Sequence, residues 1–172
     1  MSNVKALVFD WGDTLMRDFS EYQGPMVHWP RVEVIPGVPD VLPQLHEQMT
    51  CCVASNAGDS DAELMGLALA RVGIRQYFHH LVTSRELGAT KPDPTFFREI
   101  LRRLAVEPQA CIMIGNDYLK DIVPAKSTGM RTVWFSEAPV TEPASCADAV
   151  LHSMKDLVAT VMKIKDEGPS SV

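Results

Sequence analysis

Polar side chains suited to catalysis stand just after several short apolar segments of this chain. Asp10 follows the segment Val4–Phe9, and Ser55 follows the segment Thr50–Ala54. The other candidates near such segments, or in the loops between them, are Gly12, Asp13, Thr14, Asn56, Lys91, Asn116, Asp117 and Asp121. If the apolar segments are parallel strands, their carboxyl ends meet at one edge of a sheet. The sequence therefore predicts a polar site at that edge.

These residue types suit the transfer of a phosphoryl group through a covalent aspartyl intermediate. A carboxylate such as Asp10 can attack phosphorus when a divalent cation cancels the charge repulsion. A hard cation such as Mg²⁺ takes oxygen ligands, which Asp10, a backbone carbonyl and an acid or amide after Cys111–Ile114 would supply. Ser55, Asn56 and backbone N–H groups would bind the phosphoryl oxygens, and Lys91 would add a positive charge.

The elements that must position these residues alternate along the chain between apolar segments and helical patterns. Continuous apolar runs are typical of parallel strands covered on both faces. They fall at Val4–Phe9, Thr50–Ala54, His80–Thr83, Cys111–Ile114, Arg131–Phe135 and Ala149–Leu151. Helices are expected near 40–49, 60–71, 93–104, 121–128 and 153–165, the first three capped by Asp40, Ser60 and Asp93. This alternation predicts an α/β fold with a three-layer, doubly wound parallel sheet and right-handed crossovers.

Residues 15–37 interrupt the alternation and predict a short flap, or small cap, directly after the first strand. This segment contains Tyr22 and Trp29, which would either contact substrate or fasten the flap to the core. The chain of 172 residues has the length of one domain. We therefore expect a single domain over residues 1–172, with a disordered tail over residues 166–172.

The composition argues against several function classes. Lys and Arg number 16 against 22 Asp and Glu, a net charge of −6, so neither nucleic acid nor an anionic membrane is an expected partner. No apolar run approaches the ~20 residues of a membrane span, and the first residues do not follow the pattern of a signal peptide. The four cysteines lack CxxC spacing, which predicts reduced, buried thiols in a cytoplasmic protein.

In four ordered segments the sequence resembles the haloacid dehalogenase superfamily of aspartyl-phosphate hydrolases. The segments are VFDWGDTL, CCVASNA, TKPDPTFF and IMIGNDYLKDIVPAKSTGM, and they span about residues 4–135. The resemblance implies a Rossmann-like fold, a Mg²⁺ cofactor and hydrolysis of phosphate monoesters, with Asp10 as the nucleophile. It also implies phosphate-binding roles for Thr14, Ser55, Asn56 and Lys91, and metal-binding roles for Asp10, Gly12, Asn116 and Asp121.

Two positions depart from the phosphatase pattern that this resemblance suggests. That pattern has a second Asp, the general acid and base, where this chain has Gly12. Loss of such a group costs ~10²–10⁴ in rate, unless the next residue, Asp13, replaces it. The other departure is Asn116, which stands where an acid is usual. Its amide oxygen is still a ligand for a hard cation, and the Gly12 carbonyl needs no side chain to bind one.

Several alternatives remain open at the level of the sequence. Dehalogenases of the family carry a tyrosine where Gly12 stands, and its phosphonate hydrolases need a cap lysine, whereas this chain has none between Lys5 and Lys91. Phosphomonoester hydrolysis therefore fits best, on a phosphorylated substrate whose class the sequence leaves open. A short flap leaves the site open, so either the substrate is large or a second subunit of a homodimer completes the enclosure.

Two alternatives come from other function classes. The absence of an acid at Gly12 is compatible with a non-catalytic or very slow module that binds a phosphoryl group or a metal. A phospho-acceptor receiver domain would need its acceptor Asp after the third strand, where this chain has Thr83-Ser84-Arg85. Turnover of an aryl phosphate with Mg²⁺ distinguishes an enzyme from a binding module.

Overall fold

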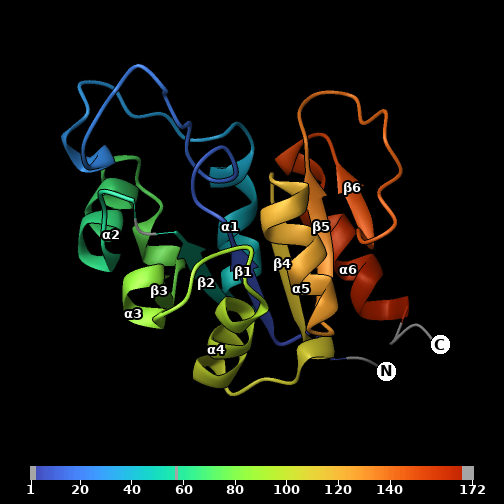
Figure 1. Ribbon diagram of the computed structural model, residues 1–172. Coiled ribbons are helices and arrows are strands. Elements are labelled where there is room, and N and C mark those ends of the chain that lie inside the picture. The colour runs from blue at the N-terminus through green and yellow to red at the C-terminus, as the bar shows by residue number, and fades with distance from the viewer. Residues whose placement is uncertain (1–2, 57, 168–172) are drawn as a thin grey trace.

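A six-stranded parallel sheet forms the centre of the computed structural model, which describes residues 3–56 and 58–167 (Figure 1). Its strand order is β3-β2-β1-β4-β5-β6. The strands are β1 Ala6–Phe9, β2 Thr50–Ser55, β3 His80–Thr83, β4 Cys111–Gly115, β5 Arg131–Phe135 and β6 Ala149–Leu151. The predicted doubly wound α/β fold is confirmed, and each predicted strand is present with its ends close to those expected.

The central strand β1 sets the position of the polar edge. Its register pairs Phe9 with Val53 of β2 on one side and with Ile114 of β4 on the other. The residues that follow these three strands therefore emerge side by side. β2 and β3 lie on one side of β1, and the chain then crosses to form β4, β5 and β6 on the other side. Open α/β sheets bind ligands at such a switch point.

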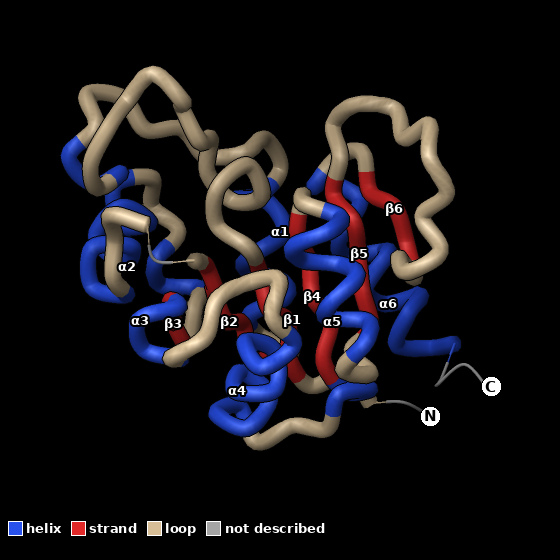
Figure 2. Tube along the Cα trace, viewed as in Figure 1, coloured by secondary structure: helices blue, strands red, loops and turns tan. Residues whose placement is uncertain are grey.

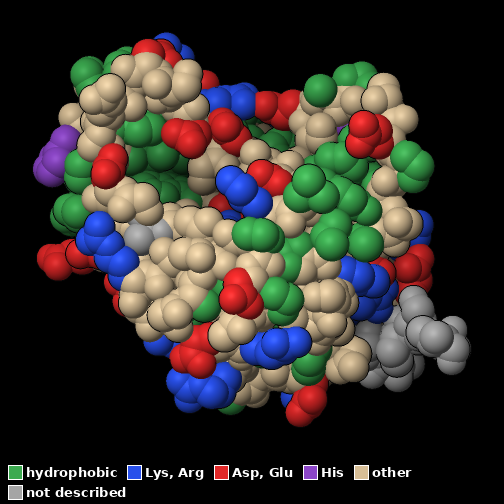
Figure 3. Space-filling model, in the orientation of Figure 1, with side chains coloured by type: hydrophobic (Ala, Val, Ile, Leu, Met, Phe, Trp, Pro, Cys, Tyr) green, Lys and Arg blue, Asp and Glu red, His purple; other side chains and the backbone are tan. Residues whose placement is uncertain are grey.

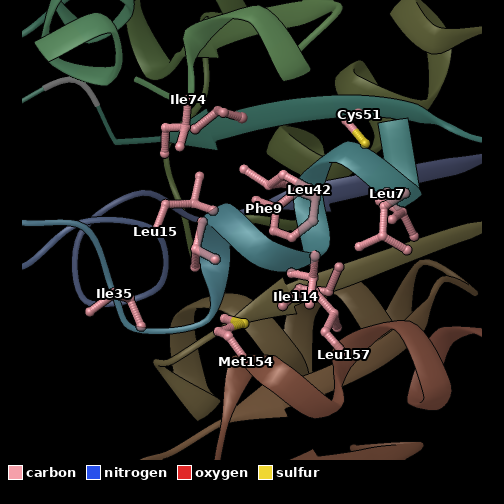
Figure 4. Packing of buried hydrophobic residues seen from close by; sticks show 14 of the residues in the cluster. Leu7, Phe9, Leu15, Ile35, Leu42, Cys51, Ile74, Ile114, Met154 and Leu157 are labelled. Carbon is pink, nitrogen blue, oxygen red and sulfur yellow. The ribbon is translucent and has the colours of Figure 1, made fainter. Parts of the chain in front are cut away.

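Helices cover both faces of the sheet, as nearly continuous apolar strands require (Figure 2). One face carries α1 Val38–His46, α2 Ala62–Arg71 and α6 Leu157–Glu167, and the other carries α3 Ser84–Leu87, α4 Pro94–Leu104 and α5 Val123–Ser127. Figure 4 shows the first core, where Leu7, Phe9 and Ile114 of the sheet meet Leu42 of α1 and Leu157 of α6. The sheet is thus held rigidly beneath its carboxyl edge.

Two predicted helix caps are corrected by the structure. The N-cap of α1 is Gly37, whose φ of +89° favours glycine, and Asp40 lies inside the first turn. There its carboxylate still faces the positive end of the helix dipole. The N-cap of α2 is Asp61, which accepts a hydrogen bond from the Leu64 amide, and not Ser60. Asp93 caps α4 as predicted.

Three further helical segments differ from the sequence-based expectation. The helix expected at 121–128 starts earlier, as a π-helical turn over Tyr118–Ile122 that leads into α5. The last helix combines a 3₁₀ turn, Met154–Asp156, with α6. α6 includes residues 166 and 167, which were expected in the tail, and residues 168–172 lie outside the described part of the chain. The short helix α3 was not predicted.

The predicted flap, residues 15–37, lies above the carboxyl edge of the sheet and beside α2 (Figure 1). It consists of loops and one 3₁₀ turn, Met26–His28. Arg71 of α2 donates hydrogen bonds to the carbonyls of Val27 and Trp29, at 2.9 and 2.8 Å. Trp29 is buried, and Tyr22 packs on it with the ring centroids 5.5 Å apart. These contacts fasten the flap to the core.

Two sequence-based expectations about the chemical environment can be compared with the structure. Within the described residues, every helix is too short or too polar to cross a membrane.

All four cysteines are free thiols, and Cys51, Cys52 and Cys111 are buried as predicted. Burial raises the pKa of Cys51 and Cys111 to about 12, which keeps them protonated and unreactive. Cys146 is only half-buried, because it lies in the loop before β6.

Candidate active site

A buried lysine joins two carboxylates at the carboxyl edge of the sheet. Asp10 follows β1, and Asp121 lies in the π-helical turn that follows β4. Lys91 Nζ donates to one carboxylate oxygen of each, at 2.7 Å in both cases. The Lys91 and Asp121 side chains are 4% and 1% exposed, whereas the Asp10 side chain is 12% exposed. Asp10 is thus the carboxylate of this group that a ligand reaches most easily.

Lys91 is held in place through its backbone as well as its ammonium group. Asn56 accepts a hydrogen bond from the Lys91 amide at 2.8 Å and donates one to the Lys91 carbonyl at 3.2 Å. The Lys91 ammonium lies 5.7 Å from the centre of the Phe96 ring of α4. Asn56 was predicted to bind phosphate, and the structure gives its amide this positioning role. Direct contact with phosphate stays a prediction.

Asp121 reaches the site because neighbouring residues leave room for it and fix it. A Cβ atom on Gly115 would lie 2.4 Å from Asp121 Oδ2, so this approach requires a glycine. The Asp117 amide donates to Asp121 Oδ2 at 3.1 Å. The Asp117 carboxylate itself caps the π-helical turn by accepting from the Leu119 and Lys120 amides. Asp117 therefore supports the turn that holds Asp121.

Thr14 lies beneath the site, with its side chain turned toward the residues that form it. It was predicted to bind phosphate; its side chain is fully buried and does not line the site pocket. Its hydroxyl lies 3.3 Å from Asp10 Oδ2 and 3.3 Å from Asn116 Oδ1. The tight turn after β1 directs the side chain inward, toward these oxygens. Thr14 therefore helps to position Asp10 and Asn116, and direct contact with phosphate stays a prediction.

The remaining predicted residues gather around one open pocket of about 260 Å³. Ser55 lines it from the end of β2, opposite Asp10 and Lys91. Its hydroxyl donates to the Asn56 carbonyl at 3.1 Å. Lys120 also lines the pocket, and was not among the predicted residues. The complete lining is Asp10, Gly12, Asp13, Asp18, Ser55, Asn56, Lys91, Asn116, Asp117, Lys120 and Asp121.

The turn after β1 also brings in a carboxylate that the sequence did not indicate. Asp13 has a φ of +55°, and its Oδ1 accepts a hydrogen bond from the Asp18 amide at 3.0 Å. A Cβ atom on Gly12 would lie 3.3 Å from Asp18 Cβ and 3.4 Å from its Oδ2. The Asp18 side chain thus fills the space beside Gly12. Its pKa is raised, first by burial and then by the charges of Asp13 and Asp10.

The donor atoms in the pocket are chemically suited to a hard cation. Carboxylate, amide and carbonyl oxygens come from Asp10, Asn116, Asp121 and Gly12, and Mg²⁺ prefers such ligands. The described residues form no cluster of three or more His, Cys, Asp or Glu that could hold a metal by themselves. A cation here would therefore need the Asn116 amide or the Gly12 carbonyl as well. The oxygen ligands present in the pocket therefore fit a hard cation such as Mg²⁺.

A second hollow adjoins the site pocket beneath the flap. It has a volume of about 320 Å³, and Trp11, Tyr22 and Trp29 lie in its wall. Tyr22 and Trp29 thus both fasten the flap and line a cavity next to the site. Of the two roles that the sequence left open, fastening of the flap is confirmed. Contact with substrate stays a prediction.

Comparison with known proteins adds independent findings. A family model described as haloacid dehalogenase-like hydrolase matches residues 5–135. Glyceraldehyde 3-phosphate phosphatase of Methanopyrus kandleri is 39% identical over 101 residues, which cover 55% of this chain and 41% of that protein. This chain spans less than half the length of the curated relatives that head the comparison.

Two solved structures illustrate the likeness in fold. An uncharacterized protein from Listeria monocytogenes serotype 4b superposes with a TM-score of 0.78 at 22% identity, over 94% of this chain and 99% of that one. A HAD phosphatase from Thermococcus onnurineus superposes with a TM-score of 0.65 at 25% identity, over 76% of this chain and 59% of that one. The first of these likenesses shows the fold alone.

Proposed function

The chain belongs to the haloacid dehalogenase-like hydrolases, and on that basis we propose that it is a Mg²⁺-dependent phosphatase acting on phosphate monoesters through Asp10. One observation carries this proposal. The Asp10 carboxylate opens into a pocket that also holds Ser55 and the buried ammonium of Lys91. The phosphatase names of its relatives support the same reaction class.

In the proposed first step, an Asp10 oxygen forms a bond to phosphorus while the bond from phosphorus to the leaving oxygen breaks. Lys91 and the Ser55 hydroxyl lie where they would stabilise the charged phosphoryl oxygens. In the second step, a water oxygen attacks the phosphorus of the aspartyl phosphate, the bond to Asp10 breaks, and phosphate leaves. Asp10, Asn116, Asp121 and the Gly12 carbonyl would hold Mg²⁺. The bound cation would reduce the repulsion between the Asp10 carboxylate and the phosphate.

The protein is expected to bind Mg²⁺ without any substrate, and to do so more weakly in acid. At a Mg²⁺ concentration of ~100 Kd, the melting temperature at pH 7.5 should rise by roughly 5–10 °C over the value in chelator. Burial, followed by the charge of Asp10, raises the pKa of Asp121 to about 6. Below that pH the proton competes with the metal, so the rise should shrink at pH 5. Equal ionic strength from KCl is the control.

The sign of this shift also fixes how the metal-free protein responds to pH. Asp121 binds its proton more tightly in the folded state than in the unfolded state, so protonation favours folding. At pH 7 the ionised Asp121 carboxylate lowers the free energy of unfolding. That loss should be recovered as the pH falls below about 6 and Asp121 becomes protonated. A Mg²⁺-induced rise in melting temperature that is equal at pH 7.5 and pH 5 would contradict this assignment of Asp121.

The proton for the leaving group is expected to come from Asp18 and not from Asp13. Asp18 fills the space beside Gly12, where the family's acid is missing, whereas Asp13 is held by the Asp18 amide. Asp18→Asn should lower the turnover of an alkyl phosphate by ~10² and that of an aryl phosphate far less, because an aryl oxide leaves without protonation. Asp13→Asn keeps an acceptor for the Asp18 amide and serves as the matched variant. A larger loss in Asp13→Asn would assign the proton to Asp13.

The proposed function is tested by turnover of para-nitrophenyl phosphate with Mg²⁺ and with excess chelator. We expect activity with Mg²⁺, loss of activity on chelation and recovery when Mg²⁺ is restored. The alternative, a non-catalytic module that binds phosphate, predicts no turnover above that of Asp10→Asn under either condition. Undiminished activity in chelator would refute the metal dependence.

A further inference from the structure

The hollow beneath the flap lies where the leaving group of a bound substrate would be placed. It shares Gly12, Asp18, Ser55 and Asn56 with the site pocket, so the two spaces lie directly beside one another. Its volume of about 320 Å³ exceeds the 260 Å³ of the site pocket. A phosphate held near Asp10 would therefore direct the rest of a small molecule into this hollow.

The walls of this hollow are aromatic and apolar on the flap side. The lining residues on this side are Trp11, Tyr22, Met26 and Trp29. All of them except Tyr22 belong to the buried core. The Trp29 indole donates to the Gly24 carbonyl at 2.9 Å, which fixes the ring. In Figure 3, hydrophobic side chains lie at the bottom of a hollow below the flap, with acidic side chains around it. The wall is thus preformed and rigid.

The charge of the hollow has one sign. Among its described lining residues the ionisable side chains besides Tyr22 are the two acids Asp18 and Asp59, and no Lys, Arg or His is present. Neither carboxylate forms an ion pair within the described part of the chain. Of the nearby arginines, Arg71 donates to backbone carbonyls of the flap and Arg31 pairs with Glu33. Arg85 donates to the carbonyl of the lining residue Gly58 at 3.3 Å, but does not itself line the hollow. The positive groups, Lys91 and Lys120, lie in the site pocket instead.

We propose that the preferred substrates are phosphate monoesters whose leaving alcohol carries a positive charge, as in a phosphorylated amino alcohol. This inference rests on the proposed phosphatase function. Lys91 and Lys120 attract the phosphate, whereas Asp59 and the aromatic wall attract a cation at the other end of the molecule. A leaving group with a carboxylate or second phosphate meets no counter-charge in the hollow and is disfavoured.

The test compares two substrates of one shape and different charge, and a third whose leaving group is anionic, on the wild-type protein with Mg²⁺. Phosphocholine is the cation, neohexyl phosphate is its neutral carbon isostere, and phosphoglycolate is an anionic monoester. We expect kcat/KM for phosphocholine to exceed that for neohexyl phosphate by roughly three- to tenfold, and phosphoglycolate to be the poorest of the three. Equal values for the first two, or preference for phosphoglycolate, would overturn the proposal.

A pair of variants locates the preference in the hollow. Asp59→Asn should lower the ratio of phosphocholine to neohexyl phosphate, with the aromatic wall retaining part of the preference, and Glu63→Gln, an exposed acid outside the hollow, should leave it unchanged. An unchanged ratio in Asp59→Asn would overturn the role of this carboxylate.

Turnover of para-nitrophenyl phosphate distinguishes failure of the proposed phosphatase function from failure of the proposed substrate class. If it is hydrolysed without a preference for the cation, only the substrate class fails. If it is not hydrolysed, the proposed function fails and the substrate class with it.

Discussion

The variant Asp10→Asn is expected to lose phosphatase turnover by roughly 10⁴-fold or more while it keeps its fold. A carboxamide has the shape of the carboxylate and can still accept the hydrogen bond from Lys91. It is a much poorer nucleophile toward phosphorus, so the covalent step is lost and positioning remains. Circular dichroism and the unfolding midpoint check the fold, and Asp40→Asn, an exposed acid of α1, is the matched control.

A second measurement separates covalent catalysis from a role in holding metal. Wild-type protein quenched in acid during turnover should carry a phosphoryl group on the peptide that contains Asp10, and the Asp10→Asn protein should not. Retention of more than a few per cent of activity in Asp10→Asn, with no phosphorylated wild-type peptide, would show that water attacks phosphorus directly. Asp10 would then act on the metal or the substrate without forming a bond to phosphorus.

The sequence was sufficient to predict the sheet and the edge where the site lies. Apolar runs that are buried on both faces predict parallel strands, and the crossover rule then places their carboxyl ends together. The residues after β1, β2 and β4, namely Asp10, Ser55 and Asn116, therefore line one pocket as expected. Lys91 joins them from a loop, and no spacing rule required that. Its place just before the helix that starts near Asp93 made it a candidate, and the resemblance of its motif to a known family supported that expectation.

The direction of individual side chains could not be predicted in the same way. Thr14 lies four residues after Asp10, but the turn between them decides whether its hydroxyl faces the pocket or the core. The partner of Asn56 is a backbone 35 residues away, so only the folded chain brings the two together. Asp18 lies in the irregular flap, where no period relates sequence position to direction. Its place beside Gly12 depends on the hydrogen bond between its amide and Asp13.

The variant Lys91→Met is expected to be the most destabilising single change at the site, because it leaves two buried carboxylates without their shared cation. Asp10 and Asp121 each place an oxygen 2.7 Å from Lys91 Nζ. Removing one partner from a buried ion pair typically costs about 3–5 kcal/mol. Lys126→Met is the matched control: it breaks the Lys126–Asp148 pair, which involves a partly exposed lysine and should cost no more than about 1 kcal/mol.

The measurement is urea unfolding of both variants and the wild type in chelator at pH 7.5, repeated at pH 5. Burial and the charge of Asp10 already raise the pKa of Asp121 to about 6 with Lys91 present, and loss of the ammonium raises it further. At pH 5 Asp121 is therefore protonated in folded Lys91→Met, the repulsion from Asp10 disappears, and most of the lost stability should return. Mg²⁺ at pH 7.5 should restore part of the lost free energy of unfolding, because a bound cation reduces the repulsion between the Asp10 and Asp121 carboxylates. A loss below about 1 kcal/mol at pH 7.5, or an equal loss at both pH values, would mean that Asp10 and Asp121 do not depend on Lys91 for their charge balance. Lys91 would then serve the phosphoryl group alone.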